Sequence, residues 1–161
     1  MGRREGVSKG GPTVRGHVMF RGSYEHTIDQ KGRLSIPSRY RELLRENYEE
    51  KFIVTRSENC LVAYPEAEWI KLEKRFSQLP HLDKSAKAVM RFLVSSATEC
   101  PVDKQGRILI PQYLRNHAGL EKDVVLAGMI DKVEIWAKDR WEKEMAETSD
   151  QFEELGGTLG I

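Results

Sequence analysis

The sequence predicts a mainly β protein with peripheral helices, in which an internal duplication forms one interlocked β-barrel. The first observation is that Asp29-Gln-Lys-Gly-Arg-Leu-Ser-Ile-Pro37 matches Asp103-Lys-Gln-Gly-Arg-Ile-Leu-Ile-Pro111 at five of nine positions. The second is that strand-like and helix-like segments follow both motifs in the same order. Because four short strands and one small helix cannot bury both sheet faces alone, we expect the two copies to close one barrel about a pseudo-two-fold axis.

Each motif contains a tight turn and a short strand. Asp-x-x-Gly supplies the turn, and its glycine suits a positive φ. The residues after this glycine alternate, so Arg33 and Ser35 should face outward while Leu34 and Ile36 face the core. In the second copy Leu109 interrupts the outward polar face. Since proline cannot donate to a strand ladder, each strand should end at the last residue of the motif.

A short helix, two strands and a longer helix should complete each copy. Ser38 is the expected N-cap of the first short helix, and Gly119 should end the second one. Apolar residues at helical spacing around Trp69 and Trp141 predict the longer helices, and Asp83 should cap a helix that links the copies. The apolar runs that predict the remaining strands are 52–55, 60–64, 124–127 and 132–136.

The duplication also sets the expected domain boundaries. We expect an N-terminal extension that is disordered or non-native (1–18), a first repeat with its closing helix (19–79), a linking helix (80–98), a second repeat (99–149) and a flexible tail (150–161).

Composition favours a folded cytoplasmic protein. Apolar residues make up 39% and charged residues 32% of the 161 residues, and no run of 18 apolar residues exists, so we expect no membrane segment. The two cysteines form no CxxC pair, which favours a reducing compartment. His26 and Cys100 share one repeat position, but two ligands do not make a metal site. No phosphate-binding glycine loop or nucleophile motif is present, so we expect neither a small-molecule cofactor nor an enzyme.

Positive charge is concentrated at the start of the chain. Residues 1–56 hold 12 Lys and Arg against 7 Asp and Glu, whereas residues 57–161 hold 14 against 18. This asymmetry is consistent with a polyanionic partner for the first region and equally with an ordinary solvated surface. Part of the excess lies within residues 1–18, without which it falls from +5 to +2.

The repeated turns carry the candidate binding residues. Asp29 can accept hydrogen bonds from turn amides and pair with Arg33, while Lys31 lies free at the tip. An oriented arginine can read a guanine edge, and a lysine neutralises phosphate. The expected DNA contacts are therefore Asp29, Lys31, Arg33, Asp103, Lys104 and Arg107, with Arg39, Arg41 and Arg115 as auxiliary contacts. The alternative is structural: the turns pin a hairpin, and the helix arginines form a solvated face.

Residues 19–37, Met19-Phe-Arg-Gly-Ser-Tyr-Glu-His-Thr-Ile-Asp-Gln-Lys-Gly-Arg-Leu-Ser-Ile-Pro37, resemble the opening of MraZ proteins. These are bacterial transcriptional regulators encoded at the head of the division and cell-wall gene cluster. The second motif and the stretch from Trp136 to Trp141 resemble the same family, so the resemblance covers residues 19 to about 149.

The resemblance implies an AbrB-like fold, in which swapped hairpins form a double-psi-like β-barrel and one chain supplies both units. It implies that the doubled Asp-x-x-x-Arg motif contacts DNA, here through Asp29 and Arg33 and through Asp103 and Arg107. It further implies a ring-shaped homo-oligomer, repression of the gene cluster and of its own promoter, and a nucleoid-associated cytoplasmic location.

The leading interpretation is a sequence-specific repressor that binds double-stranded promoter DNA with repeated sites. Several barrels on one ring would raise the apparent affinity through effective concentration. The alternative is an oligomeric scaffold that regulates a protein partner directly, as the net charge of +1, the acidic segment after Asp139 and Leu109 suggest. An enzyme is disfavoured, because Gly22-Ser23 resembles the site of a self-processing decarboxylase but no catalytic set accompanies it.

Overall fold

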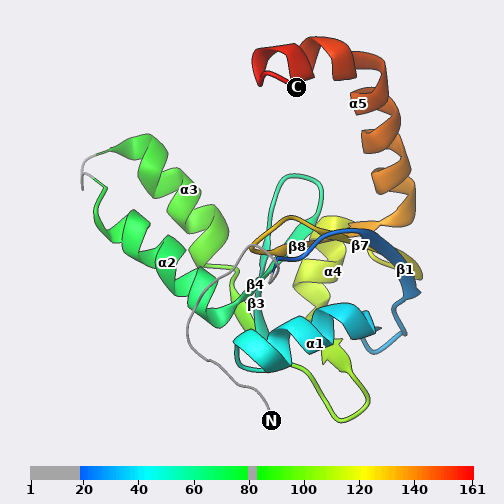
Figure 1. The fold of residues 1–161 in the computed structure, drawn as a ribbon. Coiled ribbons are helices and arrows are strands. Elements are labelled where there is room, and N and C mark those ends of the chain that lie inside the picture. Colours follow the sequence, from blue (N-terminus) through cyan, green and yellow to red (C-terminus); the bar gives the residue numbers. More distant parts are fainter. Residues whose placement is uncertain (1–18, 80–82) are drawn as a thin grey trace.

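The computed structural model describes residues 19–79 and 83–161, so the predicted extension 1–18 lies outside the described residues. The described chain contains the strands and helices of two successive repeats joined by one helix (Figure 1). In chain order they are β1 (Ser23–Thr27), β2 (Arg33–Ser35), α1 (Ser38–Asn47), β3 (Lys51–Arg56), β4 (Leu61–Pro65), α2 (Glu66–Ser77), α3 (Lys84–Val94), β5 (Thr98–Pro101), β6 (Arg107–Leu109), α4 (Gln112–Ala118), β7 (Asp123–Gly128), β8 (Val133–Ala137) and α5 (Lys138–Thr158).

The two repeats exchange strands. A six-stranded antiparallel sheet has the order β1-β7-β8-β4-β3-β5, and β2 pairs with β6 in a separate two-stranded ribbon. Strand β1 of the first repeat therefore pairs with β7 of the second, and β5 of the second repeat pairs with β3 of the first. The pair β4–β8 joins the repeats at the centre of the sheet. Each repeat thus supplies an edge strand that pairs with a strand of the other repeat.

Closure of a barrel is not shown by the described strands. The sequence predicts a closed barrel, whereas the six strands form an open sheet with β1 and β5 at its two edges. The reason is that the chain leaves each edge strand through a tight turn and enters the β2–β6 ribbon, where the equivalent strands pair with each other. The closed barrel and its swapped-hairpin form stay predictions.

One hydrophobic core serves both repeats. The ribbon contributes Leu34 and Ile108 to it, and both are fully buried, as the alternating pattern predicts. The short helices α1 and α4 add Leu44 and Leu114, and the sheet adds strand residues from both halves. Because residues of the ribbon, the sheet and both short helices pack in one cluster, neither repeat encloses a core of its own.

The helix boundaries confirm two of the predicted caps and correct a third. Asp83 caps α3 by accepting hydrogen bonds from the backbone N–H groups of Ser85 and Ala86, and Gly119 ends α4 at a positive φ of 68°. Ser38 is not the N-cap of α1 but its first residue. Pro37 occupies the cap position in an extended conformation and supplies no side-chain hydrogen bond.

Helices α2, α3 and α5 lie outside the sheet (Figure 1). The sequence predicts a flexible tail over 150–161, but α5 continues as helix to Thr158, because strong helix formers up to Leu155 outweigh the Gly156–Gly157 pair. The helix then closes with hydrogen bonds from the N–H groups of Leu159 and Ile161 to the carbonyl of Gly156. None of the helices in the described ranges is long and apolar enough to span a membrane.

Candidate nucleic-acid interface

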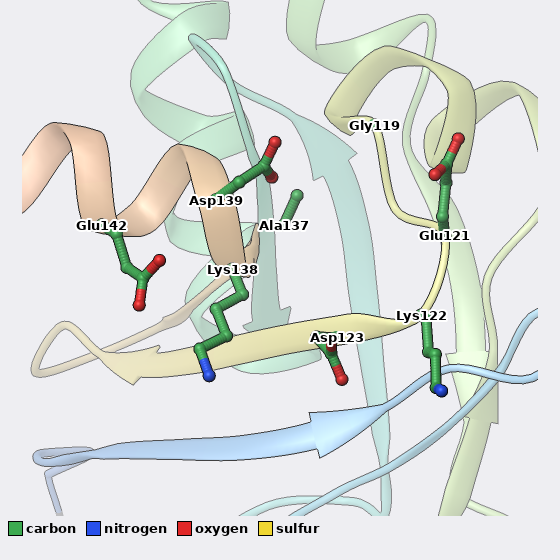
Figure 2. Close-up of a pocket in the computed structure, with 8 residues that line it drawn as sticks. All are labelled: Gly119, Glu121, Lys122, Asp123, Ala137, Lys138, Asp139 and Glu142. Carbon is green, nitrogen blue, oxygen red and sulfur yellow. The ribbon is translucent and has the colours of Figure 1, made fainter.

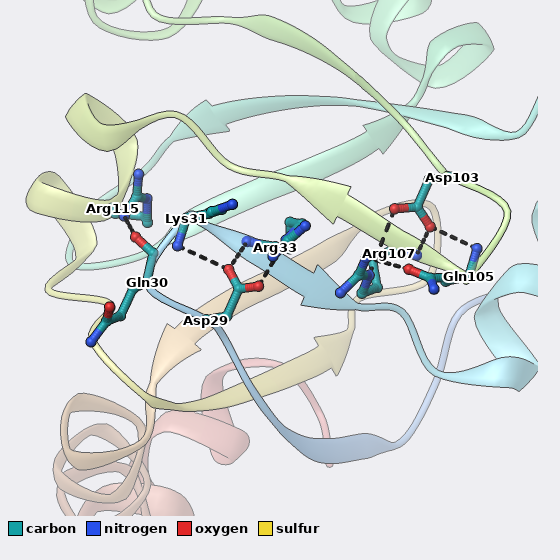
Figure 3. A network of polar contacts seen from close by, with 8 residues as sticks. All are labelled: Asp29, Gln30, Lys31, Arg33, Asp103, Gln105, Arg107 and Arg115. Atoms are coloured by element: carbon teal, nitrogen blue, oxygen red, sulfur yellow. Dashed lines mark hydrogen bonds and ion pairs between the residues drawn. The ribbon is translucent and has the colours of Figure 1, made fainter.

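The β2–β6 ribbon presents one polar face away from the core. Arg33 lies opposite Leu109, and Ser35 lies opposite Arg107, in antiparallel register. Side chains of directly opposite residues project from the same face of a ribbon, and Leu34 occupies the buried face. The outward face therefore carries Arg33, Ser35, Arg107 and Leu109, with the two motif turns at its ends (Figure 3).

The first turn fixes the orientation of Arg33. Asp29 Oδ1 accepts hydrogen bonds from the backbone N–H groups of Lys31 at 3.0 Å and Arg33 at 2.9 Å. The other oxygen, Oδ2, accepts a 2.8 Å hydrogen bond from Arg33 Nε (Figure 3). One carboxylate thus holds both the turn and the guanidinium, as the sequence predicts.

The second turn repeats the backbone pattern but holds its arginine differently. Asp103 Oδ1 accepts from the N–H groups of Gln105 at 2.8 Å and Arg107 at 3.0 Å. Arg107 Nε lies 3.6 Å from Asp103 Oδ2 and has no hydrogen-bond partner within the described residues. Instead, Nη2 of Arg107 donates to Oε1 of Gln105 (Figure 3). The guanidinium is therefore shared between a carboxylate and an amide.

The carboxylates of both turns are stabilised as anions. The pKa of Asp29 falls to about 2, first because the backbone N–H of Arg33 donates to it and then because the Arg33 side chain does. The pKa of Asp103 is also lowered, mainly by the backbone N–H of Arg107. Both aspartates therefore remain ionised at neutral pH and act as hydrogen-bond acceptors that hold the turns.

One arginine of the opposite repeat lies against each turn. Arg115 of α4 donates through Nε to the Ile110 carbonyl at 2.9 Å and through Nη1 to the Gln30 carbonyl at 3.3 Å. Its counterpart Arg41 donates through Nε to the Ile36 carbonyl at 3.1 Å, and its side chain lies against Gly106. Both guanidinium groups thus already serve backbone acceptors, and their contact with DNA stays a prediction.

The turn glycines are required by the same packing. Gly32 has φ of 94°, and a Cβ there would lie 2.5 Å from the Ile110 carbonyl oxygen. Gly106 has φ of 78°, and its Cβ would lie 2.6 Å from Nη1 of Arg41. The carbonyls of the two glycines accept hydrogen bonds from Ile110 and Ile36 of the opposite repeat. A turn residue other than glycine would therefore disturb the join between the repeats.

The other predicted residues are exposed and make fewer contacts. Lys31 and Lys104 are exposed near the tips of the two turns, and the exposed Arg39 on α1 lies 3.6 Å from Glu42. Sequence reasoning missed Gln105, which holds Arg107, and Gln30, whose carbonyl anchors Arg115. The sequence did contain a signal that the two turns differ, because the order Gln30-Lys31 in the first turn becomes Lys104-Gln105 in the second.

A pocket of about 310 Å³ lies elsewhere, at the start of α5 (Figure 2). Its charged lining residues are mostly acidic, and Lys138 at its rim pairs with Glu25 at 3.1 Å. This surface is a poor match for phosphate. Across residues 19–79 and 83–161, no group of three or more His, Cys, Asp or Glu side chains is arranged to hold a metal ion.

The chain resembles known proteins along nearly all of the described region. The family described as "MraZ protein, putative antitoxin-like" matches residues 19–92 and 93–156, so its unit occurs twice. A transcriptional regulator MraZ of Moorella thermoacetica is 49% identical over 138 residues, which cover 85% of this chain and 94% of that protein. One of Limosilactobacillus reuteri is 48% identical over 144 residues, covering 89% and 99%, and one of Pediococcus pentosaceus is 46% identical over 142 residues, covering 88% and 96%.

Both matched units contain one Asp-x-x-Gly-Arg turn and one strand of the ribbon. The duplicated family unit, the exchanged strands and the identity to full-length relatives agree with one another. The chain therefore belongs to the MraZ family.

Proposed function

We propose that this protein is a transcriptional regulator that binds double-stranded promoter DNA sequence-specifically through the β2–β6 ribbon and its two turns. The observation that carries the proposal is the pair of equivalent arginines, Arg33 and Arg107, on the outward face of one ribbon, each beside a motif aspartate. A two-stranded ribbon fits the major groove, where an arginine can donate two hydrogen bonds to guanine. The names of the relatives support a role in transcription.

The remaining motif residues have separate roles in this proposal. Asp29 and Asp103 orient the arginines, while Lys31 and Lys104 reach the phosphates that flank the groove. Arg41 and Arg115 position the turns, and the exposed Arg39 on α1 adds a phosphate contact. The target is the division and cell-wall gene cluster, including the protein's own promoter, which it represses at the nucleoid in the cytoplasm.

Assembly into a ring-shaped homo-oligomer completes the proposal, because a ribbon with four cations binds DNA weakly by itself. Exposed apolar side chains on the outer helices support self-association. One group lies on α2, on α3 and just after α2: Ile70, Leu79, Val89, Phe92 and Val94. The other group lies on α5 and just after it: Met145, Phe152, Leu155, Leu159 and Ile161.

The charges of these two surfaces are opposite. Residues 71–91 hold six Lys and Arg against two Asp and Glu, whereas residues 142–154 hold one against six. Contact between unlike surfaces of neighbouring copies generates a ring when the rotation closes. A ring presents several ribbons to repeated DNA sites at once, which raises the apparent affinity by about 10²–10⁴.

The experiment is a titration of the DNA upstream of the protein's own gene at several salt concentrations. Arg33→Ala with Arg107→Ala should abolish the preference for this DNA over a scrambled duplex. Lys31→Ala with Lys104→Ala should weaken binding to both duplexes alike. It should also flatten the slope of the logarithm of the binding constant against the logarithm of the salt concentration by about two units. The matched control, Arg45→Ala with Lys122→Ala, removes two exposed cations outside the ribbon, its turns and the proposed assembly surfaces, and should change neither. Unchanged preference in the first variant would refute the assigned interface.

A second candidate is a scaffold that binds a protein partner directly. The apolar and acidic surface of α5 favours it, since such surfaces commonly bind other proteins. A stoichiometric complex with another protein that survives Arg33→Ala with Arg107→Ala, together with no DNA preference in the unmodified protein, would select the scaffold over the repressor.

A further inference from the structure

The outward face of the ribbon carries one large apolar side chain among its cations. Leu109 is 58% exposed, whereas its neighbours Ile108 and Ile110 are fully buried. Leu109 lies directly opposite Arg33, and Arg107 is two residues away on the same face. Single exposed leucines are common on protein surfaces, but this one occupies the middle of the proposed DNA-reading face.

The equivalent position of the first repeat is polar. Ser35 corresponds to Leu109 in the duplicated motif, and it lies opposite Arg107 as Leu109 lies opposite Arg33. The face is thus symmetric in its arginines and asymmetric in the two residues beside them. A serine hydroxyl can bond to any base edge, whereas a leucine side chain can form only apolar contacts.

The major groove offers one apolar group that distinguishes bases, the 5-methyl group of thymine. We propose that Leu109 determines specificity by contacting the 5-methyl group of a thymine beside the base that Arg33 reads. This inference rests on the proposed function. Facing Cβ atoms of a ribbon lie about 5 Å apart, which spans one to two base-pair steps, so the thymine lies within about two base pairs of that base.

The proposal makes the two halves of the DNA site unequal. The half that faces Leu109 and Arg33 favours a thymine at one position. The half that faces Ser35 and Arg107 tolerates any base at the equivalent position, because the hydroxyl donates and accepts. An asymmetric reading face of this kind also gives each protomer a defined direction on the DNA.

The test replaces each thymine of the upstream DNA, one at a time, by deoxyuridine, which removes the methyl group and keeps base pairing. The unmodified protein should lose affinity about fourfold at one thymine, the factor that one buried methyl group contributes. Leu109→Ser should bind the thymine and deoxyuridine duplexes equally, and Leu109→Met should retain most of the difference. The matched control, Ile130→Ser, removes a similarly exposed apolar side chain from the β7–β8 loop and should leave the difference unchanged.

Two outcomes overturn the inference. Either the unmodified protein does not distinguish any deoxyuridine duplex, or Leu109→Ser distinguishes them as the unmodified protein does. A change in the mass of the assembly caused by Leu109→Ser, with the thymine effect intact, would place Leu109 in a protein contact instead. The double variant Arg33→Ala with Arg107→Ala is measured on the same duplexes to separate failure of this inference from failure of the proposed function. If the double variant keeps the DNA preference of the unmodified protein, the proposed function is refuted. If it loses that preference, the two outcomes above refute only the role of Leu109.

Discussion

The two motif turns share one backbone and hold their arginines in two ways. In both turns an aspartate Oδ1 accepts two backbone N–H groups, and the glycine carbonyl accepts a hydrogen bond from the opposite repeat. Arg33 donates directly to Asp29 at 2.8 Å, whereas Arg107 lies 3.6 Å from Asp103 and turns to Gln105. The fold therefore constrains the aspartate and glycine, while the two positions between them set how firmly the arginine is held.

The largest expected effect is a difference in folding stability between alanine variants of the two turn glycines. Gly32→Ala should lower the free energy of unfolding by about 2–4 kcal/mol, because a positive φ combines with a clash against the backbone carbonyl of Ile110. Gly106→Ala should cost less, since its Cβ would meet the movable side chain of Arg41. Chemical denaturation of both variants measures the difference, and equal losses would show that the turns are equally constrained.

The next effect compares the two arginines in DNA binding. Arg33→Ala should weaken binding to the upstream DNA by about 2 kcal/mol, within the range of one bidentate contact to guanine. Arg107→Ala should weaken it less, because the looser guanidinium must be ordered on binding. Equilibrium titrations of the two single variants decide this, and a greater loss for Arg107→Ala would reverse the comparison.

A smaller effect concerns the arginines that support the turns. Arg115→Lys keeps the charge but loses the planar group that joins the carbonyls of Ile110 and Gln30, so we expect a loss of DNA affinity of about 1 kcal/mol. Arg41→Lys should lose less, because its hydrogen bond stays within its own repeat. If Arg115→Ala weakens binding and Arg115→Lys does not, Arg115 contributes charge to the DNA contact and does not position the turn.

The smallest effect is a difference in titration. Asp29 should titrate at a pKa of about 2 by NMR, and the pKa of Asp103 should also lie below its ordinary value, mainly because the backbone N–H of Arg107 donates to it. Since the folded pKa of Asp29 is lower than its ordinary value of 3.8, the carboxylate stabilises the fold above that value, and this contribution is lost as the pH falls through about 2. Arg33→Ala should raise the pKa only partway, because the backbone N–H groups at positions 31 and 33 still donate. A full return to 3.8 would make the guanidinium the main cause.

The repeat allowed much of this arrangement to be predicted. The alternation around Leu34 and the Asp29–Arg33 pairing follow from local spacing, and both are present in the structure. The contact of Arg115 with Gln30 could not be predicted, because 85 residues separate the two and the contact depends on how the repeats dock. The prediction of Ser38 as the N-cap of α1 was wrong, because Pro37 takes the cap position in an extended conformation and α1 starts without a side-chain cap.

The exchange of strands between the repeats also sets the order in which the chain can fold during synthesis. Strand β1 has no partner until β7 has emerged, because Ser23 pairs with Ala127, about 100 residues later. At ordinary rates of translation this interval lasts about 5–20 s. The first half of the chain therefore waits on the ribosome with an unpaired strand edge, and folding should be completed only when the second half is available.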